Sequence, residues 1–129
     1  MASKVPQHGP LRGNGKERRS VAFRFFPDTE TDPATIYDPN DDIASIVHTS
    51  TGLFTVTLNY AVKRVYAIRP QIQLATVGTD LKCVVGPLTN PTGGGNLAFT
   101  IAVLAVATVT DVAANANNSI MVQMDLELV

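Results

Sequence analysis

Few residues in this chain have the chemistry of a catalytic or metal site. Nucleophilic catalysis needs a thiol or hydroxyl beside a base, and the single cysteine, Cys83, shares its alternation with Leu81 and Val85. That pattern predicts a buried, structural thiol rather than a reactive one. The two histidines, His8 and His48, have no second ligand at metal spacing, so we expect no zinc site. The sequence therefore predicts a protein that is not an enzyme and has no cofactor.

An acidic segment, residues 28–42, is the second candidate for chemistry. Hard cations take several carboxylate ligands, so calcium binding stays open for this segment. Because it lacks the glycine and the closing glutamate of an EF-hand loop, a solvated loop is the favoured interpretation. The glycines 93–95 have no Lys-Ser/Thr after them and open a predicted strand, which excludes a P-loop. The six acids of the segment, with no base among them, are Asp28, Glu30, Asp32, Asp38, Asp41 and Asp42.

The N-terminal residues 1–19 form a basic segment that is rich in proline and glycine. Such a composition cannot build a core by itself, so we predict an extended arm followed by one domain over residues 20–129. The arm is the predicted partner-binding segment, and a solvated tail is the alternative. Its bases lack interleaved aromatic residues, so nucleic acid is not an expected partner. The bases are Lys4, Arg12, Lys16, Arg18 and Arg19, against the single acid Glu17.

The domain is organised around the apolar run Leu97–Val109. The run is too short to cross a membrane, and its β-branched residues with unequal alternate faces favour a buried strand over a helix. No apolar segment follows the basic N-terminus as in a signal peptide, and no membrane association is expected. Short alternating segments separated by turns predict an all-β, antiparallel β-sandwich of jelly-roll type. The eight predicted strands are 20–26, 43–48, 53–59, 62–68, 71–77, 81–85, 97–109 and 119–129.

The low charge content suggests self-association. Only 16% of the 129 residues are charged while 45% are hydrophobic, and a small protein of this kind often covers apolar surface with copies of itself. Apolar residues remain on the second faces of the predicted strands. The interface candidates are Leu104, Val106, Met121 and Val129.

Three stretches carry a resemblance to a known group of proteins. Residues 52–58, GLFTVTL, are similar to the G-x-F/Y-x-V-x-L strand of small trimeric jelly rolls. A turn at residues 117–119, NNS, leads into an alternating strand that runs to residue 129, and the basic arm lies in front. This layout resembles the small capsid decoration (cement) proteins and head-fibre bases of tailed bacteriophages.

The resemblance implies a structural virion protein on the capsid exterior, assembled in the host cytoplasm. Such a protein would form a homotrimer and bind the major capsid protein with its arm and loops, stabilising the shell. The alternative is a carbohydrate- or receptor-binding β-sandwich, which would need exposed aromatic residues. The chain has no tryptophan, so Tyr37, Tyr60 and Tyr66 are the candidates for that role.

Overall fold

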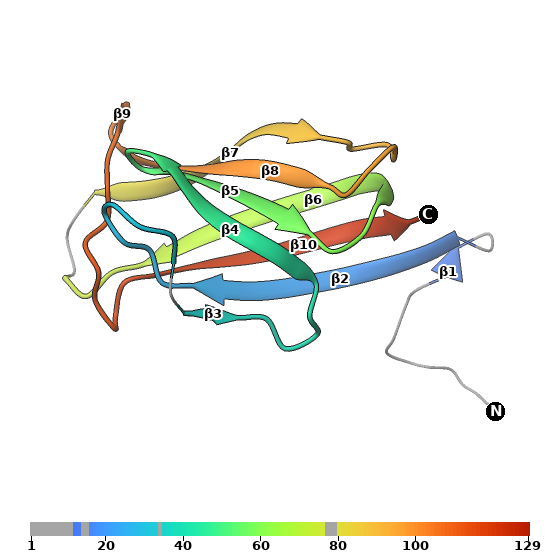
Figure 1. The fold of residues 1–129 in the computed structure, drawn as a ribbon, viewed down its shortest axis with the longest axis horizontal. Helices are drawn as coiled ribbons and strands as arrows, with labels where there is room; N and C mark the ends of the chain where they lie inside the picture. The colour runs from blue at the N-terminus through green and yellow to red at the C-terminus, as the bar shows by residue number, and fades with distance from the viewer. Residues whose placement is uncertain (1–11, 14–15, 34, 77–79) are drawn as a thin grey trace.

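The protein is an all-β chain of two antiparallel sheets. The computed structural model describes residues 12–13, 16–33, 35–76 and 80–129, and no helix occurs among them. Figure 1 shows the two layers, with β7 and β8 on one side and β2 and β10 on the other. The strands are β1 (Arg12–Gly13), β2 (Lys16–Phe25), β3 (Ile36–Tyr37), β4 (Ile43–Ser50), β5 (Leu53–Leu58), β6 (Val62–Gln73), β7 (Leu81–Thr89), β8 (Ala98–Ala105), β9 (Thr108–Val109) and β10 (Ser119–Leu128).

The strand order places the first and last long strands side by side. The first sheet has the order β1-β2-β10-β6, with β3 also paired to β2, and the second has the order β4-β5-β8-β7, with β9 paired to β8. All strand pairs are antiparallel. Strands β6 and β7 approach each other, so they border the same side of the molecule, and β2 and β4 border the opposite side.

One hydrophobic core lies between the sheets. The rings of Phe25 in β2 and Phe54 in β5 join the two layers, with their centroids 5.3 Å apart. Alternate residues of β2, β5, β8 and β10 are buried, which confirms the buried faces predicted from alternation. The buried set in these strands is Val21, Phe23, Phe25, Phe54, Val56, Leu58, Phe99, Ile101, Val103, Ile120, Val122, Met124 and Leu126.

Several predicted strand boundaries were wrong, and β7 continues to Thr89 instead of ending at Val85. The predicted strand 97–109 ends at Ala105, because the chain turns at Val106 with a φ of 61° and returns as β9. The predicted strands 62–68 and 71–77 are one strand, β6, which continues through Pro70. A proline is accepted there because β6 lies at the edge of its sheet and needs backbone partners on one side only. The first long strand begins at Lys16, four residues before Ser20.

Candidate functional site

The basic N-terminal segment enters the first sheet earlier than its composition suggests. Arg12 and Gly13 pair with Glu17 and Lys16, whereas β10 pairs with β2 only from Arg18 onward. The start of β2 and its partner β1 therefore extend past the end of the sheet, as Figure 1 shows. Lys4, the first predicted arm residue, lies outside the described residues.

Arg18 and Arg19 are sheet residues, which corrects their assignment to the arm. Arg19 Nε and Nη2 lie 2.9 and 2.8 Å from Asp42 Oδ1. The Arg18 guanidinium carbon lies 4.1 Å from the centre of the Tyr66 ring, a favourable cation–π distance. Both side chains lie in β2 and contact residues of the sheets, so they stabilise the fold. The arm and domain therefore do not divide at residue 19.

The contact of Arg19 belongs to a buried polar cluster. Asp42 is 1% exposed, and its Oδ1 also accepts a hydrogen bond from the Tyr60 hydroxyl, with 2.8 Å between the two oxygens. Burial raises the pKa of Tyr60, and its hydrogen bond to Asp42 raises it further. Asp42 Oδ2 has no hydrogen-bond partner among the described residues. The cluster fastens the end of the acidic loop to the start of β2.

A second buried carboxylate lies on the outer face of the first sheet. Glu127 in β10 is buried, with its Oε1 3.2 Å from Arg64 Nε and 3.1 Å from the Tyr66 hydroxyl. Arg18 covers the ring of the same tyrosine, so a second guanidinium group joins this cluster through Tyr66. Two of the three tyrosines, Tyr60 and Tyr66, thus donate hydrogen bonds to the buried carboxylates of Asp42 and Glu127.

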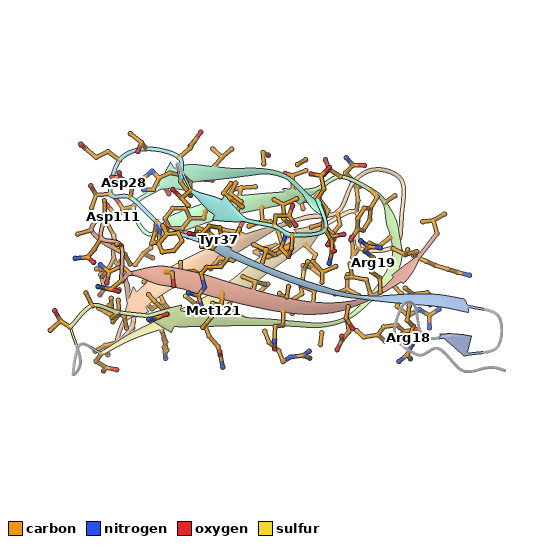
Figure 2. The ribbon with its side chains drawn as sticks, turned by 90° about the horizontal axis from the view of Figure 1, so that it is seen from below. Arg18, Arg19, Asp28, Tyr37, Asp111 and Met121 are labelled. Carbon is orange, nitrogen blue, oxygen red and sulfur yellow. The ribbon has the colours of Figure 1, made fainter. Side chains whose placement is uncertain are left out.

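A histidine–aspartate pair lies at the opposite end of the molecule from Arg18 and Arg19, where Figure 2 shows Asp111. His48 Nε2 lies 3.1 Å from Asp111 Oδ1, and the Gly52 amide donates to the same oxygen over 2.7 Å. Desolvation raises the pKa of Asp111, but the hydrogen bonds from Gly52 and His48 lower it by more. No hydroxyl or thiol hydrogen-bonds to the His48 ring among the described side chains.

Sequence reasoning missed this pair because its members are 63 residues apart. The sequence contained one signal for a close contact at this turn, the glycine Gly52 at the start of the GLFTVTL stretch. With a φ of 64°, it has no room for a Cβ, which would lie 2.6 Å from the Thr110 carbonyl oxygen. The hydrogen bonds of His48 and Gly52 to Asp111 hold the β4–β5 turn against the segment before β10.

The carboxylates of the acidic loop are spread over separate structural contacts. Asp28 Oδ1 accepts the Thr29 amide, Asp32 Oδ1 accepts the His48 amide, and the two oxygens of Asp38 accept the amides of Asp42 and Ile43. Within the described part of the chain, no three acidic, histidine or cysteine residues are grouped as metal ligands. The loop is thus held by backbone amides of its own residues and of β4.

The four predicted interface residues do not form one surface. Leu104 pairs with Val109 on the outer face of the second sheet, and Val106, in the adjoining turn, is 74% exposed. Met121 lies on the outer face of the first sheet, where its sulfur contacts Arg24 Nη2 at 2.6 Å. Val129 is exposed beyond the end of β10. Only Leu104 and Val106 are brought together.

The predicted inward direction of Cys83 is confirmed, because it pairs with the buried Val103. The thiol is half-buried rather than fully buried, and burial raises its pKa to about 12. A thiol of this kind is a poor nucleophile at neutral pH.

A surface pocket of about 350 Å³ lies between the start of the acidic loop and residues 114–116. Tyr37 borders it with 58% of its surface exposed. The Phe26 ring packs edge-on against the Tyr37 ring, with the ring centres 5.5 Å apart. Asp28 and Asn115 supply polar groups to its lining.

The described structure thus defines an all-β protein in which charged clusters hold strands and loops together. No helix in the described ranges is long and apolar enough to cross a membrane. No family model, curated protein or solved structure matches the chain.

Proposed function

We propose that this protein is a structural component of a bacteriophage virion that binds the major capsid protein from outside and stabilises the shell as a homotrimer. The observation that carries the proposal is the start of β2. Among the described residues, Lys16 and Glu17 pair with Gly13 and Arg12 and with no other strand. A basic chain segment that projects past the sheet is suited to pairing with, or following, a partner's surface.

The strand order supports a jelly-roll sandwich of the kind that the resemblance implies. The long strands cross between the two sheets, from β2 to β4 and β5, to β6, to β7 and β8, and back to β10. First and last strands that pair after such crossings are a feature of nested Greek keys. The arm in this proposal is residues 1–17, because Arg18 and Arg19 belong to the body.

Co-sedimentation with phage particles that lack this protein tests the arm. A variant without residues 1–11 keeps β1 and every described contact, and we expect it to fold normally but to bind particles at least tenfold more weakly. The full-length double variant Arg12→Gln/Lys16→Gln should also bind more weakly at low salt, and its deficit relative to the wild-type protein should shrink as salt rises, because salt screens the charge contacts that the wild-type arm makes. Arg24→Gln removes a charge from the outer face of the first sheet and should bind normally. Unchanged binding of both the truncated protein and the Arg12→Gln/Lys16→Gln variant would make the arm a solvated tail.

A carbohydrate-binding module is the second candidate, and the pocket beside Tyr37 favours it. An exposed aromatic ring next to carboxylate and amide groups offers stacking for a sugar face and partners for its hydroxyls. We expect Tyr37→Ala, compared with Tyr66→Ala as a control, to abolish retention on a glycan array if the pocket binds sugar. No binding by the wild-type protein to any glycan would remove this candidate.

A further inference from the structure

The core is incompletely covered along one side of the molecule. The fully buried apolar residues lie mainly on β2, β5, β8 and β10, whereas the partly buried residues that pack against the core are concentrated on β6 and β7 and at their ends. Because β6 and β7 border the same side, these residues form one strip, which we call the β6–β7 edge. It consists of Val65, Ile68, Ile72, Leu74, Leu81, Cys83, Val85 and Leu88.

The β6–β7 edge is also basic. Strand β6 contains three bases and no acid, and β7 contains one base and no acid, with the exposed Asp80 directly before it. Arg64 and Arg69 pair with Glu127 and Asp125. Lys63 in β6 and Lys82 in β7 are exposed and form no ion pair with any other described residue. The edge therefore offers apolar area flanked by two cations.

Prolines limit how this edge can be covered. Pro70 lies within β6 and Pro87 within β7, and each lacks the amide proton that a neighbouring strand would accept. Prolines on edge strands oppose extension of a sheet by backbone pairing. A partner would therefore cover the β6–β7 edge mainly with side chains.

The opposite side of the molecule carries the complementary groups. In Figure 2 the loop that holds Asp28 and strand β4 lie along the upper side, and β6 lies along the lower side. The loop contains six acids and no base, of which Glu30, Asp32 and Asp41 are exposed. We call this side the acidic edge.

Exposed apolar side chains accompany these acids. Ile36 and Tyr37 in β3 and Val47 in β4 are exposed. Both edges thus combine apolar contact area with charge, and their charges are opposite. Because the two edges lie on opposite sides of one chain, they cannot satisfy each other within a single copy.

We propose that the β6–β7 edge of one copy binds the acidic edge of a second copy. This arrangement is head-to-tail, and a heterologous contact of this type closes into a ring when its rotation permits. Three copies in a ring give the homotrimer of the proposed function, on whose self-association this inference rests. The apolar strip supplies affinity, and the charges select orientation and partner edge.

A charge-exchange experiment tests the contact by measuring molar mass with light scattering. The variant Lys63→Glu/Lys82→Glu reverses the two unpaired charges of the basic edge. The variant Glu30→Lys/Thr31→Lys adds two cations to the acidic edge, which offset the exposed Asp32 and Asp41, and keeps the bond from Asp32 to His48. Each variant alone should associate at least tenfold more weakly than the wild-type protein. An equimolar mixture should regain association between unlike variants, because the introduced glutamates attract the introduced lysines. The mixture should form a dimer or an even-numbered assembly rather than a trimer, because a ring of three cannot alternate two variants.

Two controls make the result specific. Gln123→Glu adds a negative charge to the outer face of the first sheet, away from both edges, and should keep the wild-type mass. Circular dichroism should show every variant to be folded. The head-to-tail contact would be overturned if either double variant kept the wild-type molar mass, or if the mixture stayed monomeric.

The wild-type protein separates this inference from the proposed function. A wild-type monomer at millimolar concentration that still co-sediments with phage particles would overturn the head-to-tail contact and leave capsid binding standing. A wild-type ring that responds to charge exchange but binds no particles would support the contact and overturn the virion role.

Discussion

Removal of the Arg19 side chain should destabilise the fold rather than act only on partner binding. Arg19 places two nitrogens within 3 Å of Asp42 Oδ1, and Asp42 is almost fully buried. Breaking a buried ion pair costs about 3 to 5 kcal/mol because it leaves a buried charge without its partner. Arg19 itself is one-third exposed and Tyr60 still donates to Asp42, so we reduce the expected cost of Arg19→Ala to about 2 to 3 kcal/mol.

Urea unfolding followed by circular dichroism measures this cost, with the slope of the transition expected to stay unchanged. Arg19→Lys keeps the charge but loses the two-nitrogen contact, so its cost should be intermediate. Arg69→Ala is the matched control, because the Arg69–Asp125 pair is about half exposed on both sides and should contribute less than about 1 kcal/mol. A loss below about 0.5 kcal/mol for Arg19→Ala would refute the reasoning and return Arg19 to the arm.

Four further changes test local features of the fold. Gly52→Ala should destabilise by about 2 kcal/mol or more, measured by urea unfolding, because a Cβ meets the Thr110 carbonyl and φ is positive. Val106→Gly should raise the melting temperature, since a β-branched residue at φ 61° is strained by about 1 to 3 kcal/mol, more than glycine's loss of entropy; a lower melting temperature would contradict this. The pKa of Asp111 is lowered in the fold, so ionised Asp111 stabilises the folded state at pH values above its ordinary pKa of 3.8. This contribution is lost as the pH falls through the lowered pKa. The free energy of unfolding of Asp111→Asn should therefore fall less between about pH 5 and 2 than that of the wild-type protein. Cys83→Ala should cost about 1 kcal/mol with particle binding unchanged, and alkylation of the native thiol at pH 8 should be slow because burial raises its pKa to about 12.

The alternation of apolar residues predicted the buried faces well. Strands such as β5 and β10 have one polar or small face and one large apolar face, and that pattern depends only on the two-residue period of a strand. The all-β class and the antiparallel pairing follow from the same pattern, because short strands with turns between them leave no room for crossover helices. The jelly-roll sandwich and the arm stay predictions.

The features that sequence reasoning missed depend on which strands are neighbours. Arg19 meets Asp42 only because the acidic loop returns to the start of β2, and His48 meets Asp111 only because the β4–β5 turn lies against the segment before β10. Neither contact has a local signature. The turn at Val106 was missed for a different reason, since its residues lack the glycine, asparagine or aspartate that hairpin turns favour.

The amount of this protein in purified phage particles tests the central claim most directly. Particles from a host culture that makes the chain can be purified by density gradient, and their proteins quantified by mass spectrometry. A virion decoration protein predicts a fixed molar ratio to the major capsid protein and labelling of the particle exterior by an antibody to this chain. Absence from the particles, or a trace amount that varies between preparations, would contradict the account.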